Sequence, residues 1–67
     1  MTQPTLIIIY ATDWCPDCLR ARRYFQAHQI PFEWINIDRD PAAEAFVRRV
    51  NHGNRSVPTI VFPDGAI

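Results

Sequence analysis

The first apolar run of the chain is "TLIIIYA", residues 5–11. Its hydrophobic residues follow one another instead of alternating with polar ones, and three of them are β-branched isoleucines. Such a run is typical of a strand that is covered on both faces, as in a parallel sheet. We therefore expect residues 5–11 to form a central strand.

The segment "PDCLRARRYFQAHQ", residues 16–29, has the spacing of an amphipathic helix. Cys18, Ala21 and Phe25 recur three or four residues apart, which places them on one side of a helix. Pro16 suits the first helical turn, and Pro31 follows the expected end. We expect a helix whose Cys18 side faces the core.

Residues 32–37, "FEWINI", alternate in the manner of a strand. Phe32 and Trp34 fall on one face of such a strand, and Ile35 and Ile37 fall on the other. We therefore expect residues 32–37 to form a strand.

The segment "DRDPAAEAFVRRV", residues 38–50, predicts a second helix. Asp40 suits the N-cap and Pro41 the first helical position. Gly53, in "NHGN", suits the C-terminal end. The expected inner stripe consists of four apolar residues: Ala42, Ala45, Phe46 and Val50.

Residues 57–62, "VPTIVF", predict a third strand, and "PDG" at 63–65 predicts a turn into a further strand that begins at Ala66. This order predicts one α/β domain over residues 1–67, with the first two strands parallel and the last two in a hairpin. Two helices leave at least one face of the sheet without its second layer. We therefore expect a terminal strand and a helix to be missing after Ile67, or a partner, such as a second copy in a dimer, to cover the gap.

Seven basic and seven acidic side chains cancel to a net charge of zero at pH 7. The chain thus lacks the basic footprint of nucleic-acid binding or of an anionic membrane surface, and neither partner is expected. The N-terminal segment has no basic start, and its apolar run is too short for a secretory signal or a membrane span. We expect a cytoplasmic protein, in which a Cys-x-x-Cys pair is more often catalytic or metal-binding than a structural bridge.

The cysteine pair in "WCPDC", residues 14–18, has three chemical interpretations. A structural disulfide is disfavoured, because it closes too short a loop to stabilise the fold much. A zinc site needs four ligands, usually with a second closely spaced pair, but His28 and His52 are single and far apart. An iron–sulfur cluster shared with a second subunit stays open as an alternative.

Redox chemistry is the interpretation that the position of the pair favours. Cys15 lies where a strand turns into a helix, and unpaired N–H groups and the helix dipole favour a thiolate there. We expect Cys15 to be the exposed nucleophile and the more buried Cys18 to attack a mixed disulfide formed on it. Asp17 adds a negative charge near Cys15, which opposes the thiolate and makes the couple more reducing.

Two motifs, "YATDWCPDCLRARRYF" and "NRSVPTIVFPDG", resemble the glutaredoxin family of the thioredoxin fold, and within it the mycoredoxins and glutaredoxin-like bacterial redoxins. The resemblance covers essentially the whole chain. It implies that Pro58 is cis and lies against the cysteines, and that the N–H and C=O of Val57 pair with an extended thiol substrate. The other substrate contacts that we expect are Trp14, Pro16, Asp17 and Arg55.

Two positions depart from the pattern of glutathione-using relatives. Many of those carry a basic residue three positions before the first cysteine and a tyrosine inside the motif, where this chain has Thr12 and Asp17. The lost cation and the added anion argue against the usual recognition of glutathione carboxylates, so mycothiol or bacillithiol is the expected thiol. Arg55 either touches a substrate carboxylate or is a solvated loop residue, and Trp14 either shapes the substrate surface or packs over the loop.

The resemblance therefore implies a thiol–disulfide oxidoreductase that reduces mixed disulfides between a low-molecular-weight thiol and proteins. It implies no metal or organic cofactor beyond the reducing thiol. Two alternatives stay open. One is a redoxin that donates electrons to ribonucleotide reductase and is recycled by thioredoxin reductase, and the other is a non-enzymatic iron–sulfur cluster carrier.

Overall fold

The computed structural model describes residues 6–67. Its elements are β1 (Ile7–Ala11), α1 (Pro16–Ala27), β2 (Phe32–Asn36), α2 (Pro41–Val50) and β3 (Thr59–Val61). The predicted order of these elements is confirmed, with somewhat shorter strands, and Thr5 lies outside the described residues. Neither of these two helices is long and apolar enough to cross a lipid bilayer.

β1 is the central strand of the sheet, whose order is β2-β1-β3. It pairs in parallel with β2, with Ile9 opposite Trp34, and antiparallel with β3, with Ile9 opposite Ile60. Both backbone edges of β1 thus have hydrogen-bonded neighbours, and its side chains alternate between the two faces. The prediction of a central strand with a parallel partner is confirmed.

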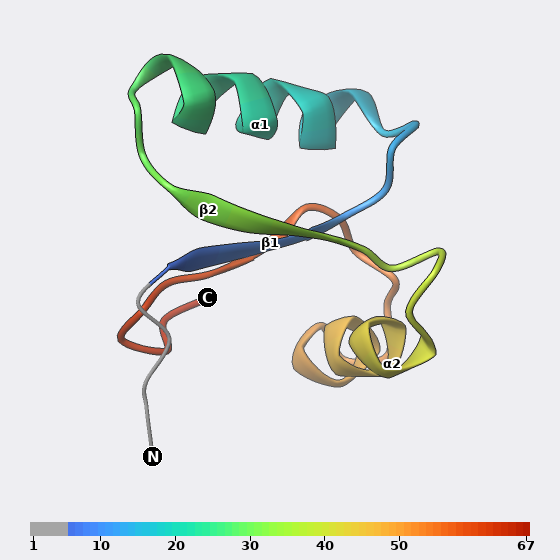
Figure 1. Cartoon of the computed structure of the whole chain (residues 1–67). Helices are drawn as coiled ribbons and strands as arrows, with labels where there is room; N and C mark the ends of the chain where they lie inside the picture. Colours follow the sequence, from blue (N-terminus) through green and yellow to red (C-terminus); the bar gives the residue numbers. More distant parts are fainter. Residues whose placement is uncertain (1–5) are drawn as a thin grey trace.

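One helix covers each face of the sheet, with α1 on one side and α2 on the other (Figure 1). The larger buried cluster lies under α1 and contains both cysteines: Ile7, Ile9, Ala11, Cys15, Cys18 and Phe25. The smaller cluster lies under α2: Ile37, Ala43 and Val47. The expectation that one face lacks a helix is therefore wrong, because the second helix crosses the sheet on the side opposite to the first.

The predicted inner stripe of α2 is wrong by one position of helix rotation. Ala43 and Val47 are the buried residues of this helix. The predicted residues are half-buried or exposed: Phe46 and Val50 are half-buried, and Ala42 and Ala45 are exposed. Alanines at several neighbouring positions leave the apolar pattern compatible with more than one stripe. The packing of Val47 with Ile37 decides between them.

The chain turns back after β3. The N–H of Gly65 donates to the C=O of Phe62 at 2.8 Å, and the N–H of Phe62 donates to the C=O of Ala66 at 2.8 Å. Gly65 has a φ of 92°, which glycine adopts without steric cost. The predicted turn at 63–65 is confirmed. Within the described residues, Ala66 and Ile67 do not form the further strand that we predicted, since these two bonds close only the turn itself.

Candidate active site

Cys15 lies between the end of β1 and the first turn of α1, where it is the N-cap residue of the helix. Its sulfur accepts a hydrogen bond from the backbone N–H of Cys18 at 3.3 Å, and Pro16 occupies the start of the helix. The sulfur is thereby directed at the positive end of α1, where N–H groups and the helix dipole favour a negative charge. The predicted placement of Cys15 is confirmed.

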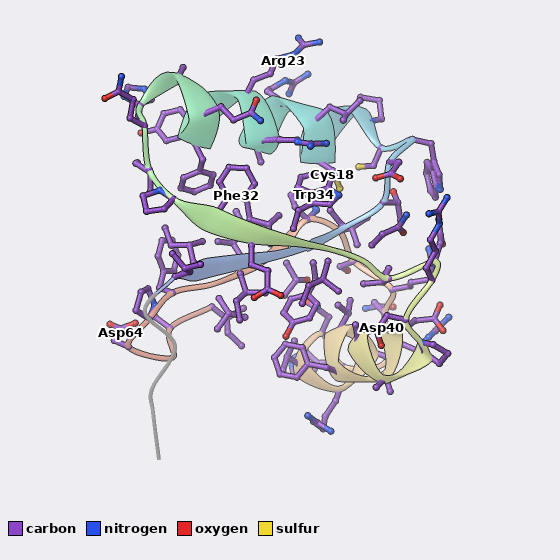
Figure 2. All side chains as sticks on the ribbon, in the orientation of Figure 1. Cys18, Arg23, Phe32, Trp34, Asp40 and Asp64 are labelled. Atoms are coloured by element: carbon purple, nitrogen blue, oxygen red, sulfur yellow. The ribbon has the colours of Figure 1, made fainter. Side chains whose placement is uncertain are left out.

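Both cysteines are free thiols and both are buried. Cys18 is 0% exposed, and Cys15 keeps 8% of its surface exposed. The predicted order of burial is confirmed, but the expectation of an exposed Cys15 is wrong in degree, because this residue belongs to the apolar cluster under α1. Figure 2 shows Cys18 between the N-terminal part of α1 and the sheet.

The protonation of the Cys18 thiol is governed by its burial. Burial first, and then a hydrogen bond with Cys15, raises the pKa of the Cys18 thiol to about 11. The backbone and the hydroxyl group of Thr12 act in the opposite direction and lower this pKa. Because neutral pH lies far below the resulting pKa, Cys18 keeps its proton there. The pair therefore consists of one sulfur at a helix N-terminus and one that is enclosed and protonated.

The loop before β3 lies against this cluster. The Val57–Pro58 peptide bond is cis, as the resemblance implied. Val57 packs against the cluster that contains both cysteines. No hydrogen bond within residues 6–67 uses the N–H or the C=O of Val57. The pairing of these two groups with a substrate stays a prediction.

Thr59 attaches this loop to α2. Its hydroxyl donates to the C=O of Ser56 at 2.8 Å and accepts from Nδ2 of Asn51 at 3.0 Å. Asn51 is the C-cap of α2 and also donates to the C=O of Val47 at 2.8 Å. The polar groups that hold the loop before Thr59 are thus satisfied by one another.

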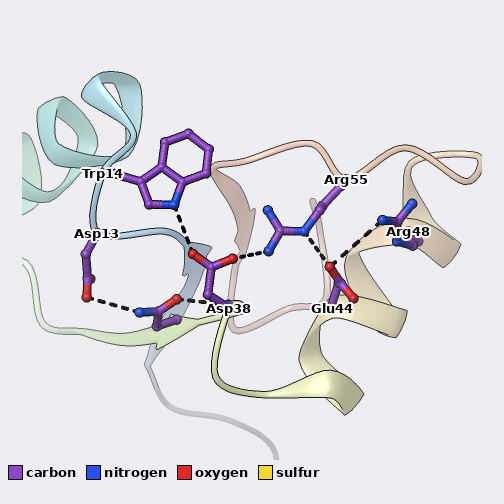
Figure 3. A network of polar contacts seen from close by, with 7 residues as sticks. Asp13, Trp14, Asp38, Glu44, Arg48 and Arg55 are labelled. Carbon is purple, nitrogen blue, oxygen red and sulfur yellow. Dashed lines mark hydrogen bonds and ion pairs between the residues drawn. The ribbon is translucent and has the colours of Figure 1, made fainter.

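A series of polar contacts joins the segment before Cys15 to the same loop (Figure 3). Trp14, which is 67% exposed, donates from Nε1 to one carboxylate oxygen of Asp38 at 2.9 Å. Arg55 donates to the other oxygen of Asp38 and also to Glu44. The bond from Trp14, followed by that from Arg55, lowers the pKa of Asp38. Arg55 is thus held by two carboxylates and is not a solvated loop residue. Its contact with a substrate stays a prediction.

Asp17 faces solvent in the first turn of α1 and pairs with Arg20 at 3.2 Å. Both side chains are largely exposed, so this pair offsets the carboxylate charge only weakly. A neighbouring cleft of about 280 Å³ is lined by Trp14, Pro16, Leu19, Arg20 and Arg23. Two predicted substrate contacts, Trp14 and Pro16, therefore share a surface with two arginines.

The sequence profile of the glutaredoxin family matches residues 7–67. This protein belongs to the glutaredoxin family. It is 43% identical over 60 residues to a Mycobacterium tuberculosis protein whose name assigns it provisionally to the glutaredoxins, across 90% of this chain and 71% of the relative. Mycoredoxin 1 of Corynebacterium glutamicum is 41% identical over 59 residues, across 88% of this chain and 72% of the relative. Glutaredoxin-like protein NrdH of Lactococcus lactis is 32% identical over 62 residues, across 91% and 82%.

These relatives confirm the resemblance and the thioredoxin-like fold that it implied. Glutaredoxins carry out thiol–disulfide exchange, so this glutaredoxin is a thiol–disulfide oxidoreductase by family, and its partners are thiol-based. The position of Cys15 and Cys18 at the start of α1 agrees with that general activity.

Sequence reasoning missed two residues of this glutaredoxin. Asp38 joins Trp14 to Arg55 over separations of 24 and 17 residues, and no local pattern marks such a contact. Thr12 stands out in the sequence only as a missing cation. In the structure it is fully buried, it lowers the pKa of Cys18, and its hydroxyl has no hydrogen-bond partner within residues 6–67. A polar residue directly after a buried strand and three positions before Cys15 is the signal that could have revealed it.

The other ligating side chains lie apart from the cysteines. Within residues 6–67, no three His, Cys, Asp or Glu side chains come together in the manner of a metal site. His28 is the exposed C-cap of α1, and His52 is an exposed residue beyond the end of α2. The described side chains therefore do not complete a zinc site around Cys15 and Cys18.

Proposed function

We propose that this glutaredoxin reduces mixed disulfides between a low-molecular-weight thiol and proteins, with Cys15 as the attacking residue. The proposal depends on how the two cysteines differ in exposure and in their position at the start of α1. The sulfur of Cys15 accepts the N–H of Cys18 at the start of α1 and retains some exposure, whereas Cys18 is enclosed. A nucleophile needs both thiolate stabilisation and access, and only Cys15 combines the two.

In the proposed reaction, the Cys15 thiolate attacks the small-thiol sulfur of the mixed disulfide. A disulfide forms between Cys15 and the small thiol, and the substrate protein leaves as a thiolate that takes a proton from water. The thiolate of a second small-thiol molecule then attacks the bound small thiol. Cys15 leaves as a thiolate, and the two small thiols are released as their symmetric disulfide. The reductant is the small thiol itself, and the step requires no further cofactor.

Cys18 offers a second way to release the small thiol. Its thiolate attacks Cys15, forms the Cys15–Cys18 disulfide and expels the small thiol. Burial raises the pKa of the Cys18 thiol, so this route requires the deprotonation of an enclosed group. The first route therefore does not depend on Cys18, and the second route depends on deprotonation of a buried group.

The loop before β3 is the proposed binding edge for the substrate. The unpaired N–H and C=O of Val57 suit an extended thiol that adds to them like a strand, with Pro58 beside it. Trp14 and Pro16 border the same site and line the cleft next to α1. Asp17 contributes a negative charge at this border, which bears on the choice of thiol.

Mycothiol or bacillithiol is the proposed thiol, in preference to glutathione. Thr12 occupies the position where many glutathione-using relatives carry a cation, and it is 0% exposed. Arg55 is engaged by Asp38 and Glu44. These two positions therefore supply no free cation for the carboxylates of glutathione. The similarity to a mycoredoxin supports the same choice.

The test compares the wild type with Cys15→Ser and Cys18→Ser on a protein mixed disulfide, with each small thiol supplied in turn. We expect Cys15→Ser to lose turnover, Cys18→Ser to retain it, and glutathione to support the lowest rate. Full activity of Cys15→Ser contradicts the assignment of the nucleophile. Loss of activity in Cys18→Ser shows that the dithiol route is the working one.

A second candidate function is a redoxin that is recycled by thioredoxin reductase and donates electrons to ribonucleotide reductase. The similarity to glutaredoxin-like protein NrdH favours keeping it. Turnover with NADPH and thioredoxin reductase, but not with a small thiol, supports this candidate over the first. Visible absorbance after anaerobic purification points instead to the iron–sulfur carrier, and a colourless protein that turns over with a small thiol argues against it.

A further inference from the structure

Two buried threonines lie at the ends of strands, Thr12 directly after β1 and Thr59 at the start of β3, and they differ in their hydrogen bonds. The hydroxyl of Thr59 donates to Ser56 and accepts from Asn51. The hydroxyl of Thr12, directly after β1, has no partner within the described residues, although the residue is 0% exposed. Buried polar groups normally have partners, so the unpaired hydroxyl of Thr12 calls for an explanation other than folding.

The neighbour on which Thr12 acts is Cys18. Both residues are 0% exposed. The backbone and the hydroxyl of Thr12 lower the pKa of the Cys18 thiol, against burial and Cys15, which raise it. A neutral thiol is a weak hydrogen-bond acceptor, which explains why the hydroxyl is unpaired in the resting state. A thiolate is a much better acceptor.

We propose that Thr12 is a positioning residue for the resolving step, and that its hydroxyl donates a hydrogen bond to Cys18 when Cys18 becomes a thiolate. The proposal rests on the proposed function, because it concerns the disulfide that forms on Cys15. Cys18 first gives its proton to water. The thiolate, held by Thr12, then attacks the sulfur of Cys15, the Cys15–Cys18 bond forms, and the small thiol leaves with the electron pair of the broken bond.

This arrangement makes Thr12 specific to one of the two routes. The second small thiol attacks the sulfur of the small thiol that is bound to Cys15. This step does not use the sulfur of Cys18. Only resolution by Cys18 requires a negative charge inside the apolar cluster under α1, where water cannot stabilise it. Thr12 therefore sets how readily the glutaredoxin passes from a mixed disulfide to its internal disulfide.

The test loads Cys15 with the coloured aromatic thiol of DTNB and follows its release by Cys18 across a range of pH. Thr12→Val keeps the branched shape and removes the hydroxyl, and Thr12→Ser keeps the hydroxyl. We expect Thr12→Val to slow release by about tenfold or more, as for the loss of a hydrogen bond to a charged group, and to move the rate profile to higher pH. Thr12→Ser should stay within about threefold of the wild type. A wild-type rate and profile in Thr12→Val overturns the proposal.

Turnover with a small thiol in the Cys18→Ser background provides the specificity control. Thr12→Val should leave this monothiol turnover unchanged, and equal slowing in both assays overturns the proposal, because the hydroxyl then acts on Cys15. Thr12→Ala serves as the second variant without a hydroxyl if Thr12→Val does not fold. DTNB loading needs no natural substrate. A failure of the proposed function therefore appears as absent turnover with every small thiol, whereas a failure of this inference appears as unchanged release.

Discussion

Thr59 and Thr12 are both buried at the ends of strands, and the polar groups around them are satisfied differently. On the α2 side, Thr59 and Asn51 satisfy each other, and Arg55 is held between two carboxylates. On the α1 side, the raised pKa of Cys18 is opposed by Thr12, whose hydroxyl has no partner within residues 6–67. The paired polar groups on the α2 side hold the loop before β3 in place, whereas the α1 side contains the reactive cysteines.

The difference shows what each region contributes to function. Paired groups on the α2 side fix the loop that carries the cis Pro58, because breaking any one bond leaves a partner unsatisfied. The hydroxyl of Thr12, which has no partner within residues 6–67, can donate to the negative charge that we propose for Cys18 during the reaction. Unsatisfied buried groups tend to lie at reactive sites, and among residues 6–67 the buried side-chain polar atom without a partner is the hydroxyl of Thr12.

The largest expected effect concerns the reactive region and alkylation of the cysteines. A pKa of about 11 for Cys18 leaves about one thiolate in a thousand at pH 8. We expect iodoacetamide to label Cys15 at pH 8 and to label Cys18 about tenfold faster for each pH unit above that. Tandem mass spectrometry locates the label, and denatured protein, in which both thiols react, is the control. Equal labelling at pH 8 contradicts the inequivalence of the pair.

The same shift has a consequence for stability. The pKa of Cys18 in the folded chain, about 11, lies above the value of about 8.5 in an unfolded chain. The protonated form is thus favoured by folding, and the contribution is fully present below about pH 8.5 and is lost as the pH rises toward the folded value. Thermal unfolding should show this alkaline loss in the wild type and a smaller one in Cys18→Ser.

The two threonines provide the next largest contrast. Thr59→Val leaves a donor of Asn51 and the C=O of Ser56 without a partner, and should lower the free energy of unfolding by about 1–3 kcal/mol. Thr12→Val removes a buried hydroxyl that has no partner and should leave stability unchanged or raise it. Urea unfolding of the two variants measures both. If both variants lose similar amounts of unfolding free energy, then the hydroxyl of Thr12 is paired in solution and the two threonines do not differ.

A smaller effect is expected from Asp38 on the α2 side. Its pKa is lowered by Trp14 and then by Arg55, so the contribution to stability is present above the unfolded pKa of about 3.9 and is lost as the pH falls through the lower folded value. Asp38→Asn should therefore be less stable than the wild type at neutral pH, and the gap should close in acid. Thermal unfolding against pH tests this. Glu33→Gln, which removes an exposed carboxylate outside the network, should show no such closing gap.

The smallest expected effect comes from Asp17 beside the reactive sulfur. Removing a solvent-exposed charge near Cys15 should speed its alkylation by at most about fivefold, the range of a surface charge interaction. Asp17→Asn should be faster than the wild type. Asp64→Asn, with the same change of charge in the turn after β3, should not differ. An unchanged or lower rate in Asp17→Asn contradicts an influence of this carboxylate on the thiolate.

The elements and the general site were predictable from the sequence because they depend on local chemistry. A β-branched run marked β1 as the central strand, and Asp40 capped α2 through the N–H of Ala43 at 3.1 Å. The Cys-x-x-Cys pair at a strand-to-helix junction indicated which sulfur lies at the helix N-terminus. Each of these features involves residues a few positions apart, so their spacing is visible in the chain itself.

The tertiary structure alone decided the features that depend on contacts between distant segments. Arg55 could have been solvated or substrate-binding, but Asp38 and Glu44 hold it from two other segments. Thr12 looked like a lost cation and is a buried hydroxyl beside Cys18. A sequence pattern says which positions are apolar or charged, but the partner of each polar group is set only when sheet and helices pack in three dimensions. The general chemistry of the site was therefore readable in the sequence, and the environment that tunes it was not.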